Sequence, residues 1–149
     1  LGPLAEPPIC TRISCGSPPV VGNGTGPTSS LMRFLDIAEY KCDEGYSTDT
    51  TNEDDKKTFE ISCQADTTFT KMEKCLAMLC GTAPAINDTT NDRTGELVYF
   101  AQPPIKYKCD DGFSLDGKAD GEKEFTIECL TTSNFEDISD LVPVKRVEC

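Results

Sequence analysis

Two short stretches of the chain alternate between apolar and polar residues in the manner of a β-strand. They are Tyr40–Cys42 and Tyr107–Cys109, and both read Tyr-Lys-Cys. Residues two positions apart on a strand face the same side, so we expect each tyrosine to share a face with its cysteine. Each stretch continues with two acidic residues, a glycine and an aromatic residue, Tyr46 or Phe113. This combination favours a turn that ends the strand.

A second alternating stretch follows each of these turns. Residues 59–63 read Phe-Glu-Ile-Ser-Cys, and residues 125–129 read Phe-Thr-Ile-Glu-Cys. Both predict strands with the phenylalanine, isoleucine and cysteine on the inner face. A further phenylalanine, Phe69 or Phe135, lies six residues beyond each of these cysteines.

The stretches belong to one pattern that occurs twice along the chain. Each copy opens with Cys-Gly, at Cys15 and Cys80, and closes on a fourth cysteine, Cys75 or Cys149. The sequence therefore predicts two small domains and a linker, at residues 15–75, 80–149 and 76–79. The linker is apolar, so we expect it to pack between the domains and to limit bending.

The remaining segments are predicted to be loops. Residues 50–57 and 114–123 are polar and acidic and lie between strands, so both are expected to be exposed hairpin loops. Residues 136–148 make the second copy longer and look like a loop insertion. We expect some of its apolar residues to return to the core: Leu141, Val142, Val144 and Val147.

Helix signals are few, and the chain is predicted to be all-β with short strands. Residues 31–40 could form one helical turn, although Asp36 and Glu39 interrupt any apolar stripe. The region between the first two cysteines is expected to be surface, yet it contains Leu31, Met32 and Phe34. Either these apolar residues are exposed or they fold back on the domain.

The cysteines indicate a disulfide framework that forms in an oxidising compartment. The chain has nine cysteines in 149 residues and no histidine, and no cysteine pair has the C-x2-C spacing of a zinc site, so a metal site is disfavoured. Two N-glycosylation sequons, at Asn23 and Asn87, agree with a secreted or cell-surface protein. Four cysteines in each copy permit three pairings, among which the residues alone do not choose.

The ninth cysteine, Cys10, lies as far before Cys15 as Cys75 lies before Cys80. By analogy, residues 1–14 are expected to be a leader that carries the last cysteine of a preceding repeat. The alternative is an unpaired thiol or an intermolecular bridge.

The repeated pattern resembles that of sushi modules, which are also called complement control protein modules. In the first copy the matching positions are Cys15 with Pro18 and Pro19, Tyr40, Cys42, Gly45, Tyr46, Ile61, Cys63 and Cys75. In the second copy they are Cys80 with Pro84, Ile105, Tyr107, Cys109, Gly112, Phe113, Ile127, Cys129 and Cys149. The resemblance covers nearly the whole chain. It implies two small, elongated, disulfide-stapled β modules in tandem.

The resemblance also implies which cysteines pair, because in that family the first pairs with the third and the second with the fourth. Carried over, the pairs are Cys15–Cys63, Cys42–Cys75, Cys80–Cys129 and Cys109–Cys149. The family normally has a tryptophan between its third and fourth cysteines, and this chain has none. Phe69 and Phe135 are expected to replace it, as in a divergent branch. The expected core aromatics are Tyr40, Tyr46, Phe69, Tyr107, Phe113 and Phe135.

Charge and composition exclude several classes of function. The net charge is −12, which disfavours nucleic acid, anionic membrane and heparin-like polyanions as partners. The absence of histidine removes Ser-His and Cys-His catalysis, so an enzyme is disfavoured. The loop from Asp116 superficially resembles a calcium loop, but Ile127 occupies the position that needs a bidentate glutamate. No cofactor is expected.

The sequence therefore predicts a non-enzymatic, extracellular segment that binds another protein or serves in adhesion, within a larger secreted or surface protein. Contact with a membrane is expected only through other parts of that protein. A complement or immune regulator is the alternative, because the resemblance permits it, and a calcium-dependent module is the remote alternative.

Overall fold

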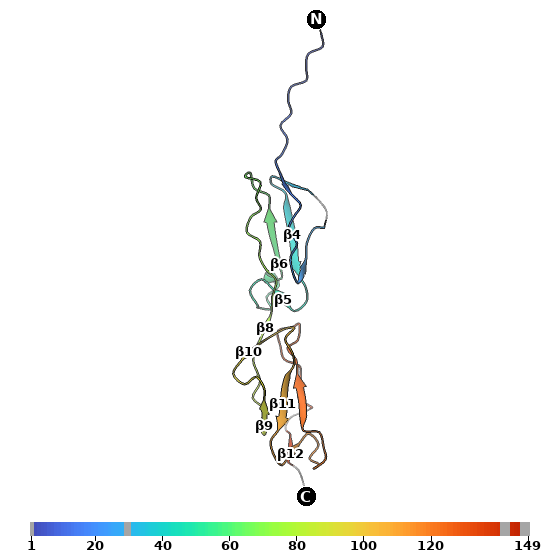
Figure 1. Ribbon diagram of the computed structural model, residues 1–149, viewed down its shortest axis with the longest axis vertical. Coiled ribbons are helices and arrows are strands. Elements are labelled where there is room, and N and C mark those ends of the chain that lie inside the picture. Colours follow the sequence, from blue (N-terminus) through green and yellow to red (C-terminus); the bar gives the residue numbers. More distant parts are fainter. Residues whose placement is uncertain (1, 29–30, 141–143, 147–149) are drawn as a thin grey trace.

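The chain consists of two elongated β units that follow one another along a single long axis (Figure 1). The computed structural model describes residues 2–28, 31–140 and 144–146. The described residues begin at one end of the molecule and finish at the other. The described residues form short strands and loops, with one turn of 3-10 helix, η1 (Asp54–Lys56). The all-β prediction is therefore confirmed.

The first unit is built from three small antiparallel sheets. The strands are β1 (Ser14–Gly16), β2 (Gly24–Thr25), β3 (Met32–Arg33), β4 (Ile37–Cys42), β5 (Tyr46–Ser47), β6 (Thr58–Ser62) and β7 (Leu76–Ala77). Strand β4 lies between β2 and β6, β1 pairs with β3, and β5 pairs with β7.

The second unit repeats this arrangement. Its strands are β8 (Leu79–Thr82), β9 (Thr89–Asn91), β10 (Leu97–Tyr99), β11 (Ile105–Cys109), β12 (Phe113–Ser114), β13 (Glu124–Ile127) and β14 (Lys145–Arg146). Strand β11 lies between β9 and β13, β8 pairs with β10, and β12 pairs with β14. Each sheet of the first unit thus has a counterpart in the second.

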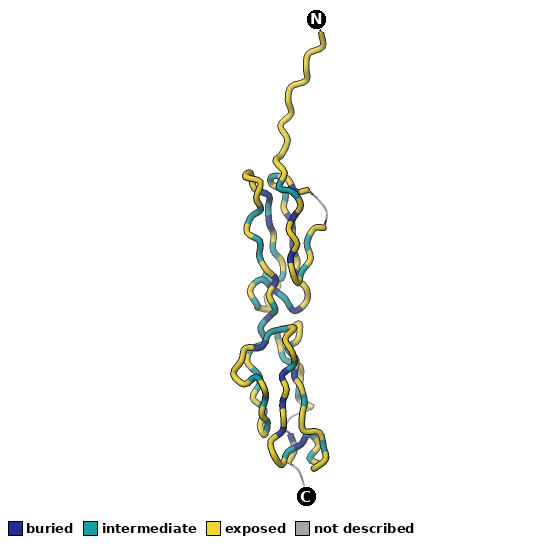
Figure 2. The backbone as a smooth tube through the Cα atoms, in the orientation of Figure 1, coloured by how far each residue is buried: buried dark blue, intermediate teal, exposed yellow. Residues whose placement is uncertain are grey.

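The alternation in the sequence places the central strands as expected. Along β4, exposed and buried residues alternate, with Tyr40 and Cys42 both buried, and β11 alternates in the same way. Buried residues run along the middle of both units (Figure 2). The two cores are separate clusters, one around Tyr40 and Ile61 and the other around Tyr107 and Ile127.

A tyrosine holds the same place in each core. Tyr40 is 2% exposed and Tyr107 is 1% exposed. Each ring stacks on a phenylalanine of the neighbouring strand, Phe59 or Phe125, with ring centres 4.9 and 5.1 Å apart. Each hydroxyl donates a hydrogen bond to a proline carbonyl, that of Pro19 at 2.6 Å or of Pro84 at 2.7 Å. Burial raises the pKa of both phenols, so both stay protonated as donors at neutral pH.

We expect the substitutions Tyr40→Phe and Tyr107→Phe each to lower the free energy of unfolding of their own unit by about 1 kcal/mol. The ring and its stacking partner are kept, so the loss reports only the hydrogen bond to the proline carbonyl. Urea unfolding of each variant checks this. A matched control is Tyr99→Phe, since Tyr99 lies in β10, outside the second core cluster.

Three disulfides staple the described residues. They are Cys15–Cys63, Cys42–Cys75 and Cys80–Cys129, with Cα–Cα distances of 5.8, 5.5 and 5.8 Å. These are three of the four pairs that the resemblance implies. Cys109 is buried, and Cys149 lies outside the described residues, so the fourth pair stays a prediction.

The structure differs from the sequence-based expectations in three places. Residues 31–40 form no helical turn, because Met32 packs in the core from β3 while Leu31 stays exposed and Phe34 is half-buried. The loop at 50–57 contains the 3-10 turn η1. The segment 136–148 was expected to be a loop, but it contributes strand β14. The burial of Val144 agrees with the expected return of its apolar residues to the core. Leu141, Val142 and Val147 lie outside the described residues.

Candidate functional site

The junction between the two units is made of ordered strands. Strand β7 pairs with β5 of the first unit, with Ala77 opposite Tyr46, and β8 begins in the second unit only two residues later. Between them lies Met78, whose side chain is 1% exposed. The Met78 amide donates to the Gly45 carbonyl at 2.9 Å, and the Leu79 amide donates to the Thr50 carbonyl at 2.9 Å. The apolar linker is thus packed and hydrogen-bonded.

Phe100 of the second unit closes the junction from the other side. Its amide donates to the Met78 carbonyl at 2.8 Å. Its ring meets Tyr46 edge-on, with centres 5.5 Å apart and planes at 88°. The same ring lies over Gly45, which has a φ of +84°, and a side chain on that glycine would overlap it. Gly45 therefore provides both the turn and the space for the aromatic contact.

Two polar contacts hold a loop of the second unit at the junction. The Asn52 side chain donates to the Thr132 carbonyl at 3.0 Å. The Ser133 hydroxyl donates to the Leu79 carbonyl. The loop after β13 thereby meets both the linker and the first unit, and the junction is held on two sides.

A groove of about 630 Å³ lies at this junction and is lined by both units. The first unit supplies two lysines and two acids around the turn, which are Lys41, Lys57, Asp43 and Glu44. The second unit supplies Thr131 and Thr132. Most of these residues are exposed. The groove therefore offers mixed charge and hydrogen-bonding groups at an open surface.

The lysines of the groove differ in their neighbours. Lys57 pairs with Asp54 at 2.9 Å, and this hydrogen bond lowers the pKa of the Asp54 carboxyl. Lys41 is exposed on β4. Lys41 is the more accessible cation for an incoming acidic group.

No cluster of three or more histidine, cysteine, aspartate or glutamate side chains that could hold a metal ion occurs in residues 2–28, 31–140 and 144–146. No helix of the described part of the chain is long and apolar enough to cross a membrane.

The two sequon asparagines and Cys10 lie at the surface, whereas most of the expected core aromatics pack against a core cluster. Asn23 and Asn87 are both exposed, and Asn23 lies in a turn with a φ of 55°. Cys10 is exposed. Among the expected core aromatics, Tyr46 and Phe69 pack against the first cluster and Phe135 packs against the second, whereas Phe113 is half-buried in β12. Phe69 and Phe135 each form a β-bridge to the preceding cysteine, Cys63 or Cys129.

Sequence reasoning did not find Phe100, Asn52 and Thr132 as junction residues. Their contacts join positions far apart along the chain, for which no local pattern gives a signal. One signal was available for Phe100. It follows β10 as Phe34 follows β3, so aligning the two copies in this region would have marked both.

Comparison with known proteins identifies the first unit. The family model for the sushi repeat (SCR repeat) matches residues 15–75. Similar proteins include "Sushi, von Willebrand factor type A, EGF and pentraxin domain-containing protein 1" of Rattus norvegicus, 35% identical over 111 residues, which are 74% of this chain and 3% of that protein.

Two further relatives are similar over most of this chain. Complement factor H of Bos taurus is 25% identical over 131 residues, covering 87% of this chain and 10% of that protein. Membrane cofactor protein of Homo sapiens is 26% identical over 134 residues, covering 88% and 32%. The chain thus spans a third or less of each of these relatives. With the matching disulfides Cys15–Cys63 and Cys42–Cys75, the family match shows that residues 15–75 form a sushi repeat.

Proposed function

We propose that this chain is a rigid, non-enzymatic, extracellular protein-binding segment made of two sushi-type modules, with the partner surface at their junction. The observation that carries the proposal is the groove that both units line. A groove shared by two units keeps its shape only if the junction between them is rigid, and here the linker is hydrogen-bonded to the first unit. Sushi repeats are extracellular protein-interaction modules, which gives the class of partner. The adhesion or assembly role belongs to the larger protein.

The proposal treats residues 80–149 as a second module of the same type, joined through 76–79. Three observations support this. Both units contain the same three sheets. Both place a stacked tyrosine against a proline carbonyl. Both form a disulfide between the first and third of their cysteines.

The chemistry of the groove favours a protein as the partner. An open groove with both lysines and acids suits the mixed charges of a protein surface, whereas the net charge of −12 disfavours nucleic acid and other polyanions. Asn23 and Asn87 are exposed, so attached glycans fit this proposal. A glycan at Asn23 would stand close to the groove, because the Asn23 carbonyl accepts a hydrogen bond from Asp43.

Charge reversal at Lys41 tests the proposed surface. We expect Lys41→Glu to weaken binding to a partner by about tenfold or more, because an interfacial cation becomes a repelling anion. The matched control is Lys108→Glu, since Lys108 occupies the same place in the Tyr-Lys-Cys stretch of the second unit, away from the junction groove. The measurement is surface plasmon resonance of the immobilised chain against a panel of secreted and cell-surface proteins.

Specific binding that Lys41→Glu loses and Lys108→Glu keeps would support the junction surface. Equal binding by both variants would contradict it, as would the absence of any specific binding protein in the panel.

A complement regulator is the second candidate, favoured by the relatives named complement factor H and membrane cofactor protein. Complement proteins therefore belong in the same panel. Binding to one of them, with the same dependence on Lys41, would favour this candidate over adhesion.

A further inference from the structure

The central sheet of each unit has one face in the core and a second face that is open to water. Along β4 the residues between the buried ones are exposed, and they are Ile37, Glu39 and Lys41. Along β11 the exposed residues are Lys106 and Lys108. Shallow hollows of about 480 and 600 Å³ lie over these two sheets. The second face of each sheet is therefore a free surface of this chain.

The two open faces differ in charge at two matched positions. Lys106 holds the place of Glu39, since each directly precedes the core tyrosine of its strand. Thr126 of β13 holds the place of Glu60 of β6, since each directly follows the stacked phenylalanine, and both are exposed. The glutamate face is defined by Ile37, Glu39, Lys41 and Glu60, and the lysine face by Lys106, Lys108, Glu124 and Thr126.

The two acids of the glutamate face have no cation close to them. Glu39 and Glu60 lie directly opposite each other on β4 and β6, and like charges in this arrangement destabilise a sheet. Lys41, on the same face, lies opposite Thr58. No ion pair to either glutamate is present among residues 2–28, 31–140 and 144–146. A cation from outside the chain would relieve the repulsion between the two carboxylates.

The lysine face carries a cation of this kind. Lys108 lies opposite Glu124, whereas Lys106 lies opposite Thr126. Asp92 flanks Lys106 on the other side, and its Oδ1 accepts a hydrogen bond from the Lys106 amide at 2.9 Å. Within the described part of the chain, the Lys106 ammonium group forms no ion pair. Lys106 is thus an exposed cation with no acid opposite it in the strand ladder.

We propose that the glutamate face of one chain binds the lysine face of a second copy, with the Lys106 ammonium group between the Glu39 and Glu60 carboxylates. Charge complementarity identifies the occupant, because each face carries the charge that the other lacks. Ile37 adds an apolar contact beside the glutamates, since its side chain is 62% exposed on the same face of β4. A contact between two faces of this size is weak and reversible.

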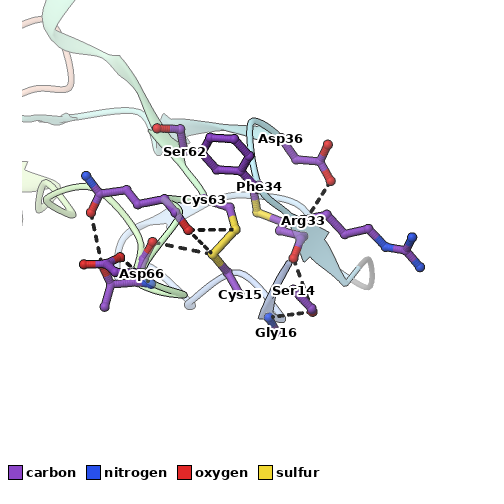
Figure 3. Close-up of a disulfide and its surroundings, with 12 residues drawn as sticks. Ser14, Cys15, Gly16, Arg33, Phe34, Asp36, Ser62, Cys63 and Asp66 are labelled. Carbon is purple, nitrogen blue, oxygen red and sulfur yellow. Dashed lines mark hydrogen bonds between the residues drawn. A yellow bond between two sulfur atoms is a disulfide. The ribbon is translucent and has the colours of Figure 1, made fainter. Parts of the chain in front are cut away.

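The glutamate face is bounded by the disulfide at one end and by the junction groove at the other. Strand β6 ends at Ser62, beside the Cys15–Cys63 disulfide (Figure 3). At the other end, Thr25 and Lys41 line both the hollow over this face and the junction groove. A second copy on the glutamate face would cover one side of the groove. Self-association is therefore expected to compete with a partner at the junction.

Sedimentation velocity of the chain over rising concentrations, up to its solubility limit, tests the proposal. Lys106→Glu alters the lysine face, and Glu39→Lys combined with Glu60→Lys alters the glutamate face. Each variant is expected to lower the association constant by about tenfold or more, because the contact then joins like charges. The matched control is Lys74→Glu, which changes the net charge as Lys106→Glu does. Lys74 is exposed and lies outside both faces, so this control is expected to associate like wild type.

The sign of the effect separates a specific contact from general charge repulsion. Each Glu→Lys exchange adds two positive charges, so the double variant carries −8 instead of −12. Weaker general repulsion would raise association, whereas the proposed contact requires it to fall. Added salt distinguishes the two in the unsubstituted chain as well, because screening weakens attraction between opposite charges but relieves repulsion between chains of equal charge. We expect association of wild type to fall several-fold at high salt.

A mixture of the two altered chains gives the sharpest test. The glutamate face is intact in Lys106→Glu, and the lysine face is intact in the double variant. An equimolar mixture is therefore expected to regain association to within about threefold of wild type, although each chain alone has lost it.

A wild-type chain that stays monomeric at every concentration would overturn the proposal. Variants that associate like wild type, or a mixture that stays monomeric, would overturn it as well. None of these measurements uses the partner protein or alters Lys41, so failure here is distinct from failure of the proposed binding surface.

Discussion

The paired substitution Cys42→Ala with Cys75→Ala is expected to unfold the first unit at 37 °C and to leave the second unit folded. Both sulfurs are buried in the first core cluster, and the bond spans 33 residues. By restricting the unfolded chain, a disulfide that closes a loop of this length raises the free energy of unfolding by about 4 kcal/mol. A domain of this size has about 3–5 kcal/mol of stability from its core alone, so the loss is comparable with the whole.

Thermal melting followed by circular dichroism and by the near-ultraviolet signal of the tyrosines measures this effect. The wild-type chain and the variant are compared with Cys10→Ala, since Cys10 is exposed and belongs to neither core. The control is expected to melt like wild type. A variant whose first unit melts at the wild-type temperature would show that packing alone stabilises the unit, contrary to this account.

The substitution Gly45→Ala is expected to separate the two units, whereas Gly112→Ala is not. The two glycines hold the same place in the two closing turns, with φ values of +84° and +86°. Both substitutions force alanine into a left-handed conformation, which costs about 1–2 kcal/mol. The new side chain at position 45 meets the Phe100 ring, while at position 112 no atom of the described residues lies within 4 Å. Any effect of Gly45→Ala on the relative orientation of the units that Gly112→Ala lacks therefore reports the contact with Phe100.

Two measurements separate the strain of the turn from the loss of the Phe100 contact. Urea unfolding is expected to show a similar loss of stability in the unit that carries each substitution. Residual dipolar couplings are expected to report a fixed orientation of the units in wild type and in Gly112→Ala, and averaged orientations in Gly45→Ala. Equal couplings in all three chains would mean that the Phe100 contact does not hold the units together.

The alternating stretches made much of the fold predictable from the sequence. Tyr40 and Tyr107 were placed on the inner face with their cysteines, because strand periodicity alone fixes which residues share a face. The same rule predicted strands at 59–63 and 125–129, and the structure has β6 at Thr58–Ser62 and β13 at Glu124–Ile127. Phe69 and Phe135 were assigned as replacements for a missing tryptophan, and both pack against a core cluster.

The parts that were not predicted depend on contacts between distant residues. Strand β3 is two residues long and forms because Met32 and Arg33 pair with β1, so the local sequence contained no signal for it. Strand β14 lies in a segment that looked like an insertion, and it forms because it pairs with β12. The apolar linker indicated a packed junction, but Phe100 and Asn52 join it from other parts of the chain, where no local pattern marks them.

The pairing of Cys109 tests the two-module organisation most directly, because the family match covers residues 15–75 and Cys149 lies outside the described residues. The measurement is mass spectrometry of unreduced proteolytic fragments. We expect a Cys109–Cys149 peptide together with Cys15–Cys63, Cys42–Cys75 and Cys80–Cys129. A bond from Cys109 to Cys10, or any bond between the two units, would contradict a second sushi-type module.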